Sequence, residues 1–207
     1  MNIAAVSSLL RKNGLSLFSV PEARLLLPRQ NRGTFALQLH QWCRKDWIRR
    51  LKHGLYEVAY PEPAAFPDFY VANRLYEPSY VSLETALSHY QILPETAAQV
   101  TSVTPKATRR FKNEHGLFLY FTVQPSAFNG YGLLRVQGRE VRIAEPEKAV
   151  LDRLYAGLRR GEDLESVAGR WDRAKLRKLD RKKLQSYARA FGASAQKLEE
   201  SLHALLR

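Results

Sequence analysis

Three prolines lie within eight residues near the end of the first third of the chain, in the run Tyr60-Pro61-Glu62-Pro63-Ala64-Ala65-Phe66-Pro67. Proline has no backbone N–H and a fixed φ, so such a run neither continues a helix nor lies inside a sheet. We interpret residues 61–67 as a semi-rigid linker. A chain of 207 residues can hold two small cores. The sequence therefore predicts one domain over residues 1–60 and a second over residues 68–207.

The first sixty residues predict three helices. Apolar periodicity indicates a helix over residues 2–13, with Gly14 as its stop signal. Ser19-Val20-Pro21-Glu22 matches a capping box and begins a second helix, which extends to Leu27 and is ended by Pro28. The third helix is expected from about residue 34 to residue 45. It carries one apolar stripe, formed by Phe35, Leu39, Trp42 and Cys43.

A β-hairpin is predicted directly after the third helix. Its strands are residues 47–51 and 55–58, separated by Lys52-His53-Gly54, and its apolar residues fall on one side. Three helices followed by a two-stranded hairpin is the arrangement of a winged helix-turn-helix domain. In such a domain the third helix enters the major groove of DNA, and the hairpin is the wing.

The second domain is expected to be α+β, which makes the whole chain α+β. Residues 68–76 and 82–91 favour helices, with Ser82 as a cap for the latter. Strands are expected at residues 98–104, 109–112, 117–123, 133–136 and 139–144. Glu145-Pro146-Glu147 begins a helix that continues to Arg159, and further helices at about 173–191 and 194–206 end the chain.

The formal net charge of +13 favours a polyanionic partner such as nucleic acid. Residues 1–60 carry +7, residues 61–145 are neutral and residues 146–207 carry +6. Cys43 is the only cysteine, which excludes an intrachain disulfide and a cysteine-rich zinc site. The N-terminus lacks the pattern of a signal peptide, and no apolar run approaches the roughly 20 residues that span a bilayer. We expect a cytoplasmic protein without membrane contact.

The third helix and the hairpin supply the candidate DNA-binding residues. Opposite the apolar stripe, glutamine side chains can bind adenine and arginine side chains can bind guanine. The basic residues around them would contact phosphates and set the register. The candidates are Arg29, Arg32, Thr34, Gln38, Gln41, Arg44, Lys45, Arg49, Arg50, Lys52 and His53. The alternative is a solvated helix beside a charged hairpin that resists edge pairing.

The remaining polar clusters do not predict catalysis. Glu145, Glu147 and Asp152 are explained as acids at the start of a helix, where the helix dipole favours them, better than as ligands of a nuclease metal. The five histidines show no metal-binding spacing, and no pattern places a nucleophile beside a base. We therefore expect no enzymatic activity, no cofactor and no metal. The basic run over residues 173–183 predicts either one solvated helical face, a second DNA contact or a docking surface for an acidic partner.

Several segments resemble the AbiEi antitoxins, which are also described as transcriptional regulators of viral defence systems. The segments are WIRRLKHGLYEV, PSYVSLETALSHYQILPE, SVTPKATRRF and FNGYGLLRVQGREVRIAEPEKAVLDRLY. The resemblance covers about residues 9–155 and is most specific in the middle of the chain.

The resemblance implies a winged helix that represses the promoter of its own operon, bound cooperatively at operator repeats. It also implies a C-terminal domain that counteracts a nucleotidyltransferase-like toxin, without a stable complex being required, in a type IV abortive-infection system for phage defence. An alternative of another class is a stand-alone transcriptional regulator whose second domain senses a signal or oligomerises. A metal-dependent nuclease is a third, more distant alternative.

Overall fold

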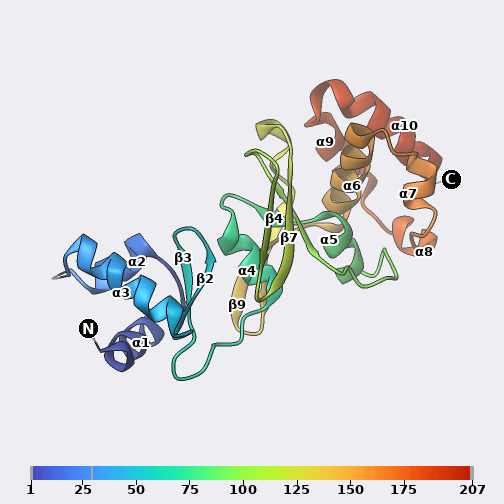
Figure 1. The fold of residues 1–207 in the computed structure, drawn as a ribbon. Coiled ribbons are helices and arrows are strands. Elements are labelled where there is room, and N and C mark those ends of the chain that lie inside the picture. The colour runs from blue at the N-terminus through green and yellow to red at the C-terminus, as the bar shows by residue number, and fades with distance from the viewer. Residues whose placement is uncertain (1, 29, 206–207) are drawn as a thin grey trace. The chain divides into compact units, whose positions relative to one another are not determined.

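The computed structural model describes residues 2–28 and 30–205, without the side chains of residues 32, 164 and 165. The described residues form ten α-helices and two sheets, so the fold is mixed α+β (Figure 1). The chain divides into two compact units, Met1–Phe66 and Pro67–Arg207. The boundary falls inside the proline-rich segment, and each unit has its own sheet and its own buried residues.

The N-terminal unit begins with three helices whose ends follow from the sequence. They are α1 (Ile3–Lys12), α2 (Val20–Leu26) and α3 (Arg32–Arg44). The Asn2 side chain caps α1, and Ser19 and Glu22 form the expected capping box at α2. The third helix begins two residues earlier than the sequence indicated, because Asn31 accepts a hydrogen bond from the Gly33 N–H and so acts as its cap.

The sheet of this unit has three strands, one more than the sequence predicted. The expected hairpin is β2 (Ile48–Lys52) and β3 (Leu55–Val58), and β1 (Leu17–Ser19) pairs antiparallel with β3 on its other side. The strand order is β1-β3-β2. Sequence periodicity missed β1 because three residues between Gly14 and Pro21 are too short to display an alternation.

The apolar stripe of α3 forms the centre of the N-terminal core, as predicted. Phe35, Leu39 and Trp42 are almost completely buried, and Cys43 is half-buried beside them. They pack with Ile48 of β2 and with the apolar face of α1. The opposite face of α3 is therefore left toward solvent.

The Arg11 guanidinium holds the end of this unit in place. Its Nη2 donates to the carbonyl oxygen of Tyr60 at 3.0 Å and also to that of Glu62. In the sequence, Arg11 is only one part of the basic charge. In the structure, its hydrogen bonds connect α1 to the start of the proline-rich segment.

The C-terminal unit is built on a six-stranded mixed sheet in the order β6-β7-β5-β4-β9-β8. Its strands are β4 (Tyr80–Val81), β5 (Val100–Thr104), β6 (Arg109–Asn113), β7 (Gly116–Thr122), β8 (Tyr131–Val136) and β9 (Arg139–Ala144). Strand β4 was not predicted, since two residues carry no periodicity. It nevertheless lies in the middle of the sheet, antiparallel to β5 and parallel to β9.

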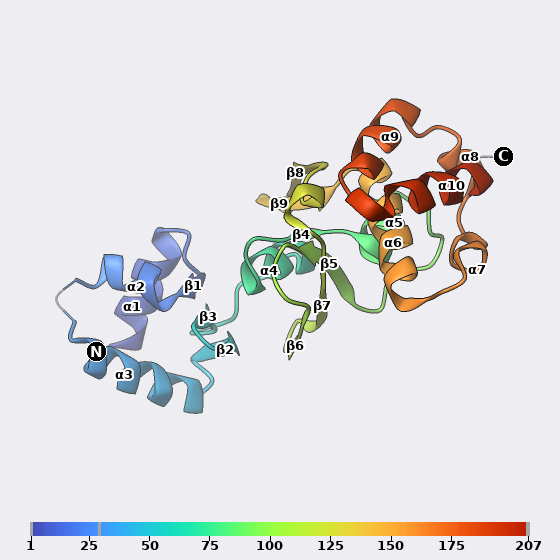
Figure 2. The ribbon, with the colours of Figure 1, turned by 90° about the horizontal axis from the view of Figure 1, so that it is seen from above.

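Helices cover both faces of this sheet. Helix α4 (Asp68–Leu75) lies on one side, and α5 (Leu83–His89) and α6 (Pro146–Arg160) lie on the other (Figures 1 and 2). Helices α7 (Leu164–Ala168), α8 (Arg173–Leu176), α9 (Arg181–Arg189) and α10 (Ala195–Leu205) follow α6. Single 3₁₀ turns, Pro125–Ala127 and Gly192–Ser194, complete the unit.

One expectation about the helices was wrong, and another held only in part. The single helix expected at 173–191 is two helices, because Asp172 and Asp180 each accept hydrogen bonds from backbone N–H groups that follow them and so begin a new helix. Ser82 occupies the N-cap position of α5, as predicted, but its side chain makes no capping hydrogen bond, because its hydroxyl donates to a buried carboxylate instead. Helix α7 was not predicted.

A buried ion pair joins α6 to the middle of the sheet. Lys148 and Asp152, one turn apart on α6, form a salt bridge in which neither side chain is exposed. The Ser82 hydroxyl donates to Asp152 Oδ2 at 2.7 Å, and the Tyr80 hydroxyl donates to the same oxygen at 3.1 Å. The Lys148 ammonium also lies 4.5 Å from the centre of the Phe191 ring. Burial raises the pKa of Asp152, while Lys148 and the two hydroxyls oppose that rise.

We expect Lys148→Met to lower the free energy of unfolding of the C-terminal unit by about 3–5 kcal/mol, because it leaves the Asp152 carboxylate buried without its counterion. Adding Asp152→Asn should restore at least about half of the loss, since the amide needs no counterion and still accepts from Ser82. Urea denaturation of the single and double variants measures both effects. A double variant less stable than Lys148→Met would contradict this account.

Candidate nucleic-acid interface

The outward face of α3 carries the polar side chains that the sequence pointed to. Thr34, Gln41 and Arg44 are exposed, and Gln38 is half-buried at the flank. Leu37 lies among them and is 68% exposed. Because the opposite face is fixed in the core, this row of side chains cannot rotate away from solvent.

Gln38 and Gln41 are held relative to each other. The Gln38 Nε2 donates to the Gln41 Oε1 at 2.9 Å. The bond occupies the carbonyl oxygen of Gln41 and directs its amide nitrogen away from Gln38. A glutamine that is oriented before binding loses less side-chain entropy when it contacts a base or a phosphate.

The β2–β3 hairpin separates its apolar and basic residues as predicted. Ile48, Leu51 and Leu55 are buried, while Arg50 is exposed. His53 is exposed at the tip, where Gly54 adopts a φ of +80° that closes the turn. A bulge between Arg50 and Lys52 shifts the register of the two strands. Lys52 and Arg49 are half-buried.

Asp46 partly neutralises the hairpin. Its two carboxylate oxygens accept from Arg49, at 3.1 Å from Nε and 3.0 Å from Nη2. These hydrogen bonds hold the pKa of Asp46 below its usual value. Lys45 lies over the Trp47 ring, with its ammonium 4.6 Å from the ring centre. The basic groups beside α3 are thus ordered by local partners.

A hollow of about 350 Å³ links the helix face to the hairpin. It is lined by Ala36, His40, Cys43, Arg44, Arg50 and Tyr56. Arg44 of α3 and Arg50 of β2 therefore border one concave surface, although they belong to different elements. Burial raises the pKa of Cys43, and the Arg50 guanidinium opposes that rise. His40 and Tyr56 were not among the predicted residues, because nothing in the linear spacing joins them to Arg50.

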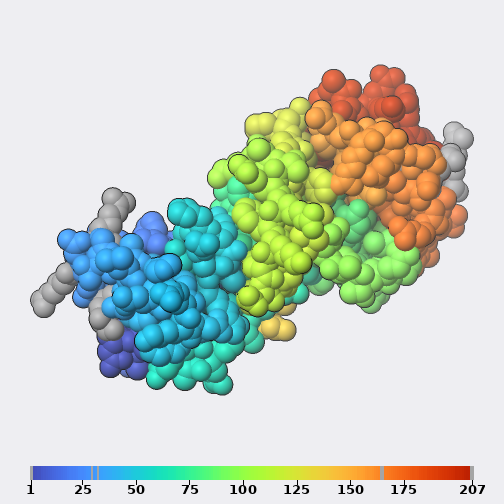
Figure 3. All heavy atoms as spheres, viewed as in Figure 1, coloured from blue at the N-terminus to red at the C-terminus, as the bar shows by residue number. Residues whose placement is uncertain are grey.

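The structure brings most of the predicted DNA-binding residues together on α3 and the hairpin, whose atoms lie on the visible surface of the N-terminal unit in Figure 3 (blue to cyan). Two predicted residues cannot be placed in this way. Arg29 lies outside the described residues. Arg32 is the first residue of α3, and its side chain is not among those described.

The acidic residues at the start of α6 have separate partners. Glu145 accepts from Lys183 Nζ at 2.7 Å and from the Tyr187 hydroxyl at 3.0 Å, and these bonds lower its pKa. Glu147 accepts from the Asp180 N–H at 2.9 Å. Glu145 is the N-cap residue of α6 and Glu147 lies in its first turn, as the helix-dipole explanation requires, although no side chain makes a capping hydrogen bond. Asp152 lies in the second turn and pairs with Lys148, so the explanation was wrong for Asp152. Within the described residues, no group of three His, Cys, Asp or Glu side chains could hold a metal ion.

The basic run over residues 173–183 does not form one solvated helical face. Lys175 donates to Gln91 Oε1 at 2.6 Å, Arg173 donates to the Leu205 carbonyl oxygen at 3.0 Å, and Lys183 is paired with Glu145. Arg177, Lys178, Arg181 and Lys182 are exposed around the break between α8 and α9. Three of the seven basic residues in the run thus bond to other parts of the unit, and the other four remain as surface charge.

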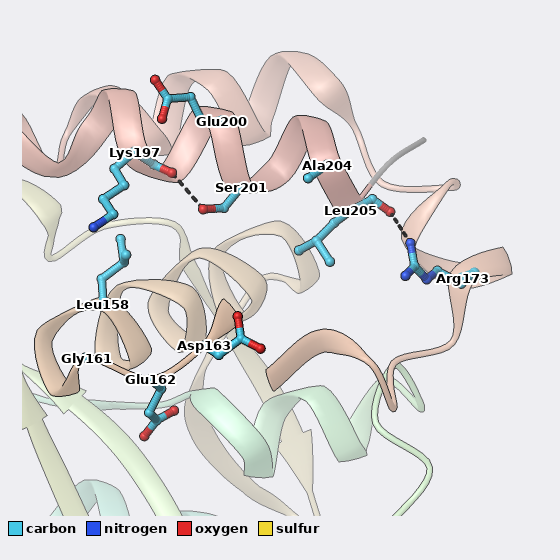
Figure 4. Close-up of a pocket in the computed structure, with 10 residues that line it drawn as sticks. All are labelled: Leu158, Gly161, Glu162, Asp163, Arg173, Lys197, Glu200, Ser201, Ala204 and Leu205. Carbon is cyan, nitrogen blue, oxygen red and sulfur yellow. Dashed lines mark hydrogen bonds between the residues drawn. The ribbon is translucent and has the colours of Figure 1, made fainter. Parts of the chain in front are cut away.

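A hollow of about 840 Å³ lies between the end of α6 and α10 (Figure 4). Its wall mixes Arg173 and Lys197 with Glu162, Asp163 and Glu200. The hydrogen bonds drawn in it join side chains to backbone carbonyls of the same wall, from Ser201 to Lys197 at 2.7 Å and from Arg173 to Leu205. The first contact lies within α10 and the second joins α8 to α10, and neither points to a position for a reacting group.

Comparison of the chain with models of known protein families gave no match, and comparison with curated protein sequences gave none either. Among residues 2–28 and 30–205, no helix is long and apolar enough to cross a membrane.

Proposed function

We propose that the N-terminal unit is a winged helix-turn-helix domain that binds double-stranded promoter DNA. The observation that carries this proposal is the outward face of α3, where Gln41 and Arg44 lie exposed beside the basic β2–β3 hairpin. The order α1-β1-α2-α3-β2-β3 supports it, with α3 as the recognition helix and the hairpin as the wing.

In this proposal the two elements divide the work of recognition. Gln38, Gln41 and Arg44 contact base edges in the major groove, where glutamine pairs with adenine and arginine with guanine. Arg49, Arg50, Lys52 and His53 on the hairpin contact the backbone or the minor groove. Asp46 reduces the positive charge of this wing, because its carboxylate accepts hydrogen bonds from Arg49, one of the two adjacent arginines.

We propose further that the chain is an antitoxin and autorepressor that counteracts a nucleotidyltransferase-like toxin without enzymatic activity of its own. This part rests on the resemblance of the C-terminal unit to the AbiEi antitoxins. The quoted segments include β4, α5, β8, β9 and the first part of α6, and thus the buried Lys148–Asp152 pair and the two hydroxyls that donate to Asp152. The alternative is a regulator whose second unit acts only on its own DNA binding.

We expect Arg49→Ala/Arg50→Ala to weaken binding about equally on operator and random DNA. The dependence of log K on log salt should become shallower by about one for each phosphate group that the variant no longer binds. Asp46→Asn should strengthen binding to both DNAs, since it removes a negative charge from beside the wing. Fluorescence anisotropy at several salt concentrations measures both.

The matched control for the wing is Arg109→Ala/Arg110→Ala. It removes the same charge from two adjacent exposed arginines on β6. If the control changes the salt dependence as much as the wing variant does, net charge explains the effect and the wing is not in the interface.

Alanine at Gln41 or Arg44 should act differently from alanine on the wing. We expect a cost of about 1–3 kcal/mol on the operator and little change on random DNA, because base contacts carry the sequence information. The operator is obtained first by selection from a random pool with the full chain. Equal losses on both DNAs would show that these side chains contact phosphates only.

The two units should separate the two activities. We expect residues 1–66 to bind the operator and residues 67–207 to protect cells from the cognate toxin, since each unit has its own core. Co-expression of each fragment with the toxin measures protection. If residues 67–207 fold but do not protect, and a full chain that cannot bind DNA also fails, protection acts through repression and the alternative regulator is correct.

A further inference from the structure

The two edges of the six-stranded sheet differ in chemistry. Strands β6 and β8 lie at opposite ends of the sheet (Figure 2). Strand β6 carries Arg109, Arg110 and Lys112 within five residues, which is a common protection against pairing with another strand. Strand β8 has the sequence YGLLRV, with one charge and two exposed apolar side chains.

The backbone of β8 presents unpaired groups at its outer edge. Gln137 and Gly138 form a two-residue turn with positive φ at both positions, so Val136 and Arg139 are a hydrogen-bonded pair. At the other end, the Glu145 N–H donates to the Gly130 carbonyl oxygen. Since hydrogen-bonded pairs alternate along an antiparallel ladder, the N–H and C=O groups of Tyr131, Leu133 and Arg135 point away from β9.

The partner of Leu133 in the ladder supports this assignment. Leu133 lies opposite Arg142, whose backbone N–H and C=O both bond to the Asn73 side chain rather than to β8. The pair is thus of the non-hydrogen-bonded type. Within the described residues, the structure shows no backbone hydrogen bond to the outer edge of β8.

The side chains above this edge are exposed and ordered. Leu133 is 70% exposed and Tyr131 is 37% exposed. The Tyr131 ring stacks on the buried Tyr80 ring, with centroids 4.7 Å apart and an interplanar angle of 19°, so its position is fixed. Tyr131, Leu133 and Arg135 alternate with the other residues of β8 and therefore share one face.

We propose that β8 pairs antiparallel with β8 of a second copy of this chain, around a two-fold axis at Leu133. In this register Leu133 meets Leu133, and Tyr131 of each copy meets Arg135 of the other. The residues that face each other are those whose backbone groups point outward, so each facing pair can form hydrogen bonds. The only charge on the strand lies opposite an aromatic ring rather than a like charge.

A second copy fits this edge better than a β6 strand does. Pairing of β8 with β6 would bring Arg135 against a strand with three cations, and head-to-tail pairing does not close. The two-fold arrangement uses β8 on both sides and leaves the charged β6 strands as the only edges. It therefore yields a closed dimer rather than a fibre.

Sedimentation velocity of the full chain without DNA tests the proposal. We expect a concentration-dependent dimer between about 1 µM and about 1 mM. Leu133→Lys should raise the dissociation constant at least about tenfold, because two ammonium groups then face each other at the axis. Leu25→Lys is the matched control, since Leu25 is an exposed leucine on α2, far from β8 in sequence, and should leave dimerisation unchanged.

Leu133→Pro tests the backbone separately from the side chain. It removes an N–H that points outward and leaves the β8–β9 ladder intact, so the monomer should keep its circular dichroism spectrum while the dimer is lost. A correctly folded Leu133→Pro chain that still forms the dimer would exclude pairing through this edge.

Cysteine cross-linking in a Cys43→Ser background tests the register. Leu133→Cys should cross-link to itself, because paired Cα atoms lie about 5.5 Å apart, within the range of a disulfide. Tyr131→Cys should cross-link with Arg135→Cys but not with itself, since copies of residue 131 would lie about 14 Å apart. A chain that stays monomeric throughout, or cross-links equally in every combination, overturns the proposal. The DNA-binding proposal is unaffected by either result.

Discussion

The Asp152 carboxylate is the interaction on which the C-terminal unit depends most. Strand β4 has two residues and could not hold its place in the middle of a six-stranded sheet through ladder hydrogen bonds alone. Tyr80 and Ser82, at the start of β4 and just after it, both donate to Asp152 on α6. The helix thus fixes the strand. Lys148 neutralises the carboxylate at a place where an unpaired charge would be costly.

The same region tolerates an unusual backbone. Leu83 follows Ser82 with a φ of +58°, which is unfavourable for a residue with a branched side chain. Thr101 holds this turn by donating to the Ser82 carbonyl oxygen at 2.7 Å and by accepting from the Thr85 N–H at 3.1 Å. A short strand, a strained turn and a helix start are therefore fixed by a few buried hydroxyl groups, which is why their geometry does not follow from local propensity.

The dependence of these elements on contacts between distant residues explains which parts of the fold the sequence could predict. The stripe of α3 and the capping box of α2 depend on neighbours in the chain, and both were predicted correctly. Strands β1 and β4 exist because distant residues pair with them, and both were missed. Periodicity places Asp180 on the surface of one long helix, whereas its side chain begins a new one. For the candidate site, the outward residues of α3 followed from periodicity, but the Asp46–Arg49 pair and the hollow shared by Arg44 and Arg50 required the hairpin's position.

The segments that carry the family resemblance contain buried core residues as well as residues of the proposed binding surfaces. Arg49 and Arg50 lie in WIRRLKHGLYEV, and Leu133 lies in FNGYGLLRVQGREVRIAEPEKAVLDRLY. In the run SLETAL, Ser82, Leu83, Thr85, Ala86 and Leu87 are buried, and in EPEKAVLD the pair Lys148–Asp152 is fully buried. These residues specify the core of the unit. The outward face of α3 and the outer edge of β8 are formed by exposed residues whose replacement leaves that core intact. A shared core with independent surfaces allows chains of one fold to differ in operator and partner. Under the two proposals, the choice of DNA sequence depends on exposed residues such as Gln41 and the choice of partner on Leu133, while the buried residues of the motifs maintain the fold.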